Sequence, residues 1–255
     1  MKKNIAFIIS GQFRGFDLEN HSKFIFTEEL NTLYNYDVFI VVDNVDKKKY
    51  YDYFGDKLKS IFCTDTDIDE EYQTNNIIKN DIHQNLLISS FRTKIAFKLI
   101  EKEGKKYDYI FKMRPDVIIY NNIINNFKLL DILQNRQIYF IWDMCIIGRF
   151  DIMKYFCNLY DKLPVKEKEN NNNIFIHNGL ISYDNYKNWP INAPETQICE
   201  LLMDYLKVNN MSIDESLKDS HIDCSLYNRN FKHHKNNKFP DNYYDLCEDY
   251  KLLDN

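Results

Sequence analysis

The sequence predicts an α/β protein, a single domain with a mostly parallel, Rossmann-type sheet flanked by helices. Short apolar runs at 4–9, 37–43 and 107–113 alternate with segments of helical periodicity, the pattern of repeated strand–helix–strand units. The runs are continuous rather than alternating, which is typical of parallel strands buried on both faces. A chain of 255 residues supports one large domain or two small ones, and no internal repeat is visible.

The elements follow from the same patterns, in chain order. In the first part we expect a strand at 4–9, a helix at 21–34, a strand at 37–43, a helix near 47–56 and a shorter strand at 59–63. The acidic, Asn-rich stretch 64–80 has no periodicity and is predicted to be a loop or lid.

A long helix is predicted over 82–103, and Gly104 is a suitable cap for its end. Its apolar residues recur four apart and make one face: Leu87, Phe91, Ile95 and Leu99. Beyond it we expect strands at 107–113 and 137–142, a helix at 150–163, a strand at 174–183, a helix at 195–206 and a late strand at 222–228.

Composition excludes several classes of protein. Six Gly, five Pro and 15% aromatic residues do not fit a collagen-like, linker-like or disordered chain. The net charge of -5 argues against a nucleic-acid partner, which needs a basic face. The apolar run Ile5 to Ile9 is too short for a signal peptide, and no run of 18 apolar residues exists to span a membrane. We therefore expect a cytoplasmic protein, in the host cytoplasm if the source is viral, with reduced cysteines.

Arginine is scarce in this chain. The surplus of Asn, Lys and Ile indicates an AT-rich genome, so each Lys says little, whereas only six residues are Arg. Because the guanidinium offers a planar fork of donors that suits phosphate and carboxylate, the positions of the arginines deserve more weight.

The segment after the first strand is the first candidate site. Ser10, Gly11, Gln12 and Arg14 lie where a parallel strand ends and ligands bind in such folds. Two of the six Gly, Gly11 and Gly15, fall in this segment, which suggests a tight turn. The segment matches neither a GxGxxG motif nor a P-loop. Arg14 could grip a diphosphate; the alternative is an ordinary strand-to-helix turn with a surface arginine.

Arg114, Pro115 and Asp116 follow the strand at 107–113 and make the second candidate site. Residues i and i+2 of an extended segment project to the same side. A cation and a carboxylate together suit a metal-bound diphosphate, with Asp116 on Mn²⁺ or Mg²⁺ and Arg114 on a phosphate or a neighbouring carboxylate. The alternative is a local salt bridge at the strand exit.

Four segments, taken in order, resemble a nucleotide-sugar-dependent glycosyltransferase of the GT-A fold: IAFIISGQFRGF, HQNLLISSFRTKIAFKLIEKEGKKYDYIFKMRPDVII, YFIWDMCIIGRFDIMKYF and APETQICELL. The resemblance covers about 4–208. It is to the lineage in which Arg-x-Asp replaces Asp-x-Asp, as in bacterial polysaccharide-synthesis and large-DNA-virus proteins. It implies a GT-A domain at 1–238, with a nucleotide-binding half at about 1–120, an acceptor half at about 121–238 and a peripheral acidic, aromatic segment at 239–255.

The same resemblance implies roles for the candidate residues. Ser10, Gly11, Gln12 and Arg14 would hold the nucleotide of a UDP- or GDP-sugar. Arg114 and Asp116 stand at the metal- and diphosphate-binding motif. With arginine in its first acidic position, one metal ligand is missing, so the need for Mn²⁺ or Mg²⁺ is expected to be weaker, or Arg114 partly replaces the ion.

Asp143 and Glu195 are the acceptor-side candidates. Asp143 ends a strand beside Trp142, where a desolvated carboxylate can act as a general base and the indole can stack on a sugar. The alternatives are a helix-capping Asp and a core Trp. Glu195 follows Pro194 at a helix start, where capping alone explains both residues; the resemblance makes it an acceptor-side acid or a structural anchor.

His221 is the candidate late metal ligand, with His177 as a second choice, although a lone histidine is more often simply hydrogen-bonded or exposed. Arg92, on the long helix, is a candidate for the nucleotide site, with a surface position as the alternative.

Three functions are compatible with these residues. The leading one is a hexosyltransferase-type enzyme that moves a sugar from a nucleoside diphosphate sugar to a hydroxyl of a glycan, protein or small molecule. The missing first acid keeps open a non-catalytic nucleotide- or glycan-binding module. A weaker third is another Rossmann-like enzyme, such as a nucleotidyltransferase.

Overall fold

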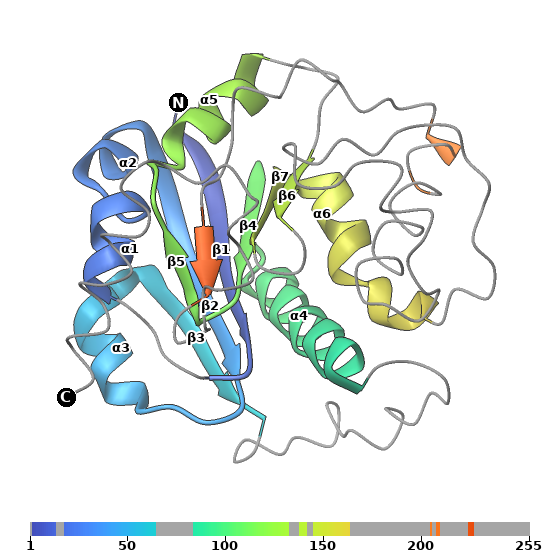
Figure 1. Cartoon of the computed structure of the whole chain (residues 1–255). Coiled ribbons are helices and arrows are strands. Elements are labelled where there is room, and N and C mark those ends of the chain that lie inside the picture. Colours follow the sequence, from blue (N-terminus) through green and yellow to red (C-terminus); the bar gives the residue numbers. More distant parts are fainter. Residues whose placement is uncertain are drawn as a thin grey trace, which may run out of the picture.

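The computed structural model describes residues 2–13, 18–64, 84–132, 138–141, 145–163, 205, 208–209 and 224–226. Its centre is a six-stranded sheet in the order β3-β2-β1-β4-β7-β6 (Figure 1). The strands are β1 (Lys3–Gly11), β2 (Tyr34–Val42), β3 (Leu58–Cys63), β4 (Tyr109–Met113), β6 (Ile138–Ile141) and β7 (Cys145–Arg149). β3, β2, β1 and β4 are mutually parallel, and only β7 opposes the rest, so the predicted mostly parallel α/β sheet is confirmed.

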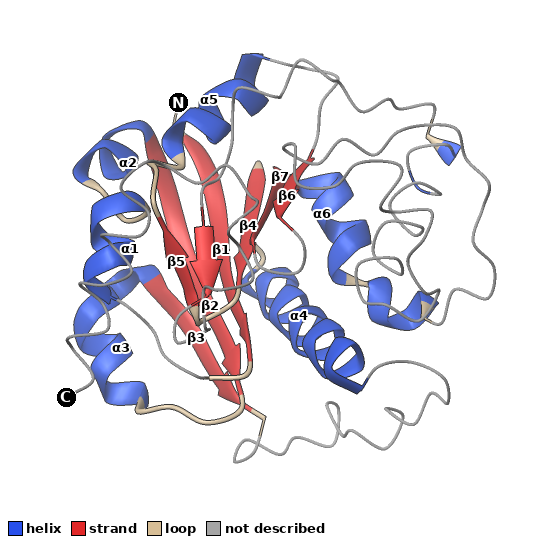
Figure 2. Cartoon of the chain, viewed as in Figure 1, coloured by secondary structure: helices blue, strands red, loops and turns tan. Residues whose placement is uncertain are grey.

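Helices cover both faces of this sheet (Figure 2). One face packs against α1 (Leu18–Phe24), α2 (Glu28–Leu33), α3 (Lys47–Phe54) and α5 (Ile124–Ile132), and the other against α4 (Gln84–Glu103) and α6 (Phe150–Cys157). Because successive residues of a strand point to opposite faces, β1 sends Ile5, Phe7 and Ile9 into the first core and Ala6 and Ile8 into the second. Short 3-10 turns follow α3 (Gly55–Lys57) and α6 (Leu159–Lys162).

A second, two-stranded sheet lies against the first core. β5 (Val117–Ile119) pairs antiparallel with β8 (Cys224–Leu226), which confirms the late strand expected at 222–228. On α1, the buried Asn20 side chain donates to the Ile119 carbonyl and accepts from the Ile119 amide, both at 2.8 Å. This helix therefore holds both backbone hydrogen-bonding groups of Ile119, which fixes the segment that follows Arg114 and Asp116.

Two expectations about local structure are wrong, and three elements were not predicted. The helix expected over 21–34 is two helices, because the Thr27 side chain accepts from the Leu30 amide at 3.1 Å and starts α2. α5 and β5 were not predicted, and β7 was not recognised as a strand. The helix expected over 150–163 stops at Cys157 and continues as a 3-10 turn.

Some of the remaining expectations are confirmed, and others concern residues that the structure does not describe. The long helix is present as α4, and Gly104 caps it with a φ of +69°. Cys63, Cys145 and Cys157 are buried and free, as expected. No helix in the described ranges is both long and apolar enough to cross a bilayer. The predicted lid, most of the helix at 195–206, the strand at 174–183 and the segment 239–255 lie outside those ranges.

Candidate functional site

The carboxyl edge of the parallel sheet carries several of the predicted site residues that the structure describes: Ser10, Gly11, Gln12, Arg114 and Asp116. β1, β2, β3 and β4 run in one direction, so Gly11, Val42, Cys63 and Met113 lie at the same edge. Ligands of such sheets bind outside this edge, since helix amides and loop backbones converge there. Polar residues follow these strand ends: Gln12 after β1, Asp43 after β2, Thr64 after β3 and Arg114 after β4.

Gly11 and Pro115 bring the first two candidate segments together. Gly11 has a φ of +149°, and a Cβ there would lie 3.2 Å from Pro115 Cδ and 3.8 Å from Arg114 Cγ. An L side chain rarely adopts that backbone conformation, and the proline ring cannot move aside cheaply. Glycine is therefore favoured at this position, and the segments 10–12 and 114–116 lie side by side in the candidate site.

Arg114 and Asp116 form a two-point ion pair. Arg114 Nε donates to Asp116 Oδ1 and Nη2 donates to Oδ2, each at 2.9 Å. The carboxylate is 1% exposed, whereas the Arg114 side chain keeps 15% of its surface accessible. The pair has the fork geometry that gives guanidinium–carboxylate contacts their strength and direction. Of the two side chains, that of Arg114 is the more exposed.

The first loop is also tied to β2. The Phe13 amide donates to Asp43 Oδ1 at 2.6 Å, and the Phe13 ring meets Tyr50 of α3 edge to face. Gln12, between Gly11 and Phe13, is exposed. Asp43 was not among the predicted site residues, although a carboxylate directly after a buried strand was a visible signal for it.

The helix α4 supplies a second row of polar groups. Ser10 is fully buried, and its Oγ lies 3.1 Å from Thr93 Oγ1, so this hydroxyl contacts the helix. Arg92 is 8% exposed and donates from Nε and Nη2 to Thr64 Oγ1 at 3.2 and 3.1 Å. The alternative of a surface position for Arg92 is wrong. The buried stripe of the helix, which includes 92, 95–96 and 100, is rotated from the predicted face. It keeps Ile95 of that face, whereas Phe91 and Leu99 are only partly buried.

Thr64 links that helix to the sheet edge. Its backbone amide donates to the Val42 carbonyl at 2.7 Å, and its side chain lies 3.2 Å from the same oxygen. The hydroxyl that receives Arg92 is thus anchored at the ends of β2 and β3. Thr64 and Thr93 were not predicted, because a single threonine at a loop start or inside a helix carries no sequence signal of its own.

The described residues do not make a divalent-cation site. Both oxygens of Asp116, the expected ligand, accept hydrogen bonds from Arg114. In the part of the chain that the structure describes, no group of three or more His, Cys, Asp or Glu side chains could hold an ion. This donor set does not fit Mn²⁺ or Mg²⁺.

Five candidate residues lie outside the described residues: Arg14, Asp143, His177, Glu195 and His221. For Asp143, the flanking residues are informative. Ile141 and Cys145 pair with each other in the β6–β7 hairpin, and Cys145 also pairs with Met113 at the end of β4. The chain on either side of Asp143 therefore reaches the same edge of the sheet as Arg114.

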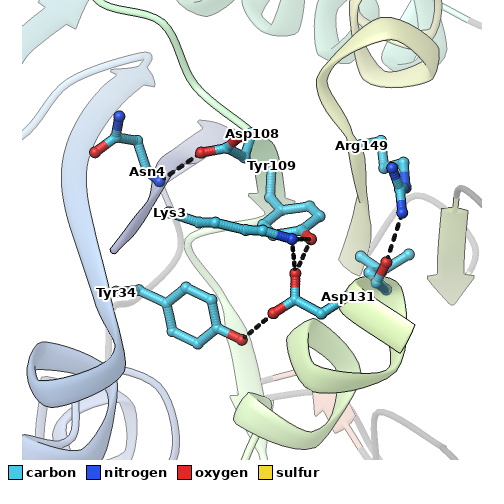
Figure 3. Close-up of polar contacts among 8 residues, drawn as sticks. Lys3, Asn4, Tyr34, Asp108, Tyr109, Asp131 and Arg149 are labelled. Atoms are coloured by element: carbon cyan, nitrogen blue, oxygen red, sulfur yellow. Dashed lines mark hydrogen bonds and ion pairs between the residues drawn. The ribbon is translucent and has the colours of Figure 1, made fainter. Parts of the chain in front are cut away.

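The opposite edge of the sheet carries a second polar cluster, drawn in Figure 3. Asp131 of α5 accepts hydrogen bonds from Lys3, Tyr109 and Tyr34, the last at 3.0 Å. Lys3 begins β1, Tyr34 begins β2 and Tyr109 begins β4. Nearby, the Asn4 amide donates to Asp108 Oδ2 at 2.8 Å. This amino-edge cluster joins a helix to three strand beginnings.

Hydrogen bonding sets the ionisation of the amino-edge cluster. Burial alone would raise the pKa of the Asp131 carboxyl, but hydrogen bonds from Lys3, Tyr109 and Tyr34 outweigh it and hold the pKa below 3.8. Burial alone would lower the pKa of Lys3, and its bonds to Asp131 and Tyr109 raise it above 10.5 instead. Burial and the Asp131 charge raise the pKa of Tyr34. At neutral pH, the cluster is an ion pair with two neutral phenols.

No protein-family model and no curated protein matches the chain. Among solved structures, it is similar to a proposed nucleotide-diphospho-sugar transferase from Desulfovibrio desulfuricans G20, at 13% sequence identity and a TM-score of 0.38. The match covers 83% of this chain and 78% of that protein. A similarity of this size carries no argument about function.

Proposed function

We propose that the chain is a nucleotide-sugar-dependent glycosyltransferase of the hexosyltransferase type, which uses a UDP- or GDP-sugar. The observation that carries the proposal is the contact between the Gly11 loop and the Arg114 segment at the carboxyl edge of a parallel sheet. A glycine lets the backbone approach a diphosphate closely, and a partly exposed guanidinium supplies a positive charge beside it. The resemblance of four ordered sequence segments supports the donor class.

The proposed reaction forms a bond from an acceptor oxygen to the anomeric carbon and breaks the bond from that carbon to the diphosphate. The negative charge that grows on the departing diphosphate is met by Arg114 and, on the resemblance, by Arg14. Asp143 takes the proton of the acceptor hydroxyl as a general base. Glu195 is proposed as an acceptor-side acid or anchor. The acceptor is a hydroxyl of a glycan, protein or small molecule.

The remaining predicted residues have supporting roles in this proposal. Gln12 is exposed and is proposed to contact the nucleotide. Ser10 and Arg92 contact Thr93 and Thr64, so we assign them to holding the sheet edge and α4 in register beneath the donor. The roles of His221 and of Mn²⁺ or Mg²⁺ stay predictions from the resemblance, and no step of the proposed reaction depends on them.

A screen of nucleotide-sugar hydrolysis and transfer tests the proposal. The full chain is incubated with UDP- and GDP-sugars, with and without Mn²⁺, and free UDP or GDP is measured. We expect turnover of at least one donor, and we expect Asp116→Ala to abolish it while the circular dichroism spectrum stays that of a folded protein. Full turnover by the variant would remove Asp116 from the site.

One observation favours the non-catalytic alternative. The Asp116 carboxylate is 1% exposed and engaged by Arg114, as expected of a structural pair. A binding module predicts that UDP or GDP raises the melting temperature while no donor is hydrolysed or transferred to any acceptor in a broad panel. Binding of a nucleoside triphosphate and of no nucleotide sugar would instead favour a nucleotidyltransferase.

A further inference from the structure

Asp116 faces Arg114 rather than the outside of the molecule. Two hydrogen bonds of 2.9 Å engage both carboxylate oxygens, and 1% of the side chain is exposed. A divalent cation at Asp116 would have to displace the guanidinium from a buried carboxylate. Breaking a buried pair leaves an uncompensated charge, which is strongly unfavourable. The geometry therefore opposes the use of Asp116 as a metal ligand.

Arg114 occupies the outward position of the pair. Its side chain is 15% exposed, and its Cγ lies beside Gly11 of the first loop. Pro115, between the two charged residues, fixes its own φ and restricts Arg114 to an extended backbone. The guanidinium is thus held from two sides, by Asp116 and by the backbone, at the position where a diphosphate is proposed to bind.

The charges of the pair match those of a metal site. Two carboxylates and a divalent cation have a net charge of zero, and so do one arginine and one aspartate. In a poorly solvated site, a guanidinium acts on an anion more strongly than in water. On this comparison, Arg114 would take the place of the cation that meets a diphosphate.

We propose that the Arg114–Asp116 pair is a built-in substitute for a divalent cation, so that this protein binds diphosphate without metal, with Asp116 positioning the Arg114 guanidinium. The inference rests on the proposed function for its biological substrate, but the recognition of diphosphate is a separate property. It predicts that chelators leave binding intact, and that the geometry of Arg114 matters as well as its charge.

Isothermal titration calorimetry of the full chain tests this with inorganic pyrophosphate, UDP and GDP, in EDTA and in saturating Mg²⁺. We expect the Kd for pyrophosphate in EDTA to lie within about threefold of that in Mg²⁺. Arg114→Lys keeps the charge but loses the fork, and we expect it to weaken binding in EDTA by about 10- to 100-fold. Arg149→Lys, the same change at the opposite edge, should leave the Kd unchanged.

Arg114→Asp makes a second test, because it recreates two carboxylates at positions i and i+2. We expect it to lose binding in EDTA and to regain part of it when Mg²⁺ is added. Melting temperatures of all variants, measured without ligand, ensure that only folded proteins are compared. An Arg114→Asp protein that binds pyrophosphate in EDTA as well as the wild type does would overturn the proposal.

The remaining outcomes separate the two proposals. Two results would overturn the proposal that the ion pair replaces a metal: pyrophosphate binding that needs Mg²⁺, or an Arg114→Lys effect no larger than that of Arg149→Lys. Neither result contradicts the proposed glycosyltransferase function. Binding of pyrophosphate in EDTA without binding or turnover of any nucleotide sugar supports the substitute and overturns the glycosyltransferase. No binding of pyrophosphate, UDP or GDP under either condition overturns both.

Discussion

The two edges of the central sheet use charged residues in opposite ways. At the carboxyl edge, Arg114 and Asp116 are two residues apart on one segment, and the cation is the more exposed partner. At the amino edge, Lys3 and Asp131 are far apart in sequence and contact each other directly. Tyr109 bonds both of them, and Tyr34 donates to Asp131. One pair is built by local geometry, and the other depends on the assembled fold.

From this difference we expect the amino edge to serve stability and the carboxyl edge to serve the proposed binding. Asp131 connects α5 to the beginnings of three strands, so its loss loosens contacts that are distant in sequence. Asp116 contacts its near neighbour Arg114, a contact that fixes the direction of one side chain rather than the packing of separate elements. Variants at the amino edge should therefore lower the stability of the fold and leave the affinity for diphosphate unchanged. Variants at the carboxyl edge should lower that affinity.

The largest effect is expected for Gly11→Ala. The new Cβ meets Pro115 Cδ at 3.2 Å with a φ of +149°, so we expect a loss of about 1–3 kcal/mol in the free energy of unfolding. The displacement also moves Arg114, so pyrophosphate binding should fall by more than tenfold. Urea denaturation and calorimetry measure the two effects.

Gly104→Ala is the matched control for that variant. Gly104 also has a positive φ, of +69°, but a Cβ there would meet nothing within 4 Å. We expect Gly104→Ala to lower the free energy of unfolding by about 1 kcal/mol, because a side chain with a positive φ at a helix end is unfavourable. Pyrophosphate binding should stay unchanged. If both variants weakened binding equally, the close approach of Gly11 to Pro115 would have no special role.

Sequence patterns predicted the parallel strands because each is a continuous apolar run. They missed β5 and β7 for physical reasons. β5 is three residues long, and its partner β8 lies more than 100 positions away, so no local periodicity marks it. β7 follows β6 after three residues, and the combined run 138–149 gives no sign of where the chain reverses.

The site was predicted in part. Scarce glycine and arginine pointed to Gly11 and Arg114, and their contact in the structure follows from β1 and β4 being neighbours. The direction of Asp116 could not be predicted, since both a metal ligand and a salt bridge fit residues i and i+2 on one side of an extended segment. Thr64 and Thr93 contribute through tertiary contacts with Arg92 and Ser10, which no single sequence reveals.

Asp131→Asn is the next largest change. The carboxylate loses its charge and one acceptor for the hydrogen bonds from Lys3, Tyr34 and Tyr109, so we expect the free energy of unfolding to fall by about 1–2 kcal/mol. The affinity for pyrophosphate should not change, because the cluster lies at the other edge of the sheet. A change of affinity above threefold would contradict the separation of the two edges.

The pH dependence of stability should follow the same carboxylate. Its pKa in the folded protein is below 3.8, so its contribution is complete above pH 3.8 and is lost as the pH falls through the folded value. The difference in unfolding free energy between the wild type and Asp131→Asn should therefore shrink below pH 3.8. Urea titrations at a series of acidic pH values measure it; a constant difference would show that Asp131 does not titrate with folding.

The smallest effect is expected for Lys128→Ala, which removes the surface ion pair between α5 and Glu29 of α2. The pair is 2.8 Å long, but its side chains are 46% and 48% exposed, so water and salt screen it and we expect a loss of at most about 0.5 kcal/mol. Lys3 is almost as exposed, at 42%, yet its partner Asp131 also receives two tyrosine hydroxyls. The free energy of unfolding of both variants is measured in urea at low salt. If Lys128→Ala lowered it as much as Asp131→Asn does, charge alone would explain the stabilising effect of the amino-edge cluster. A much smaller loss would assign that effect to the hydrogen bonds that converge on the Asp131 carboxylate.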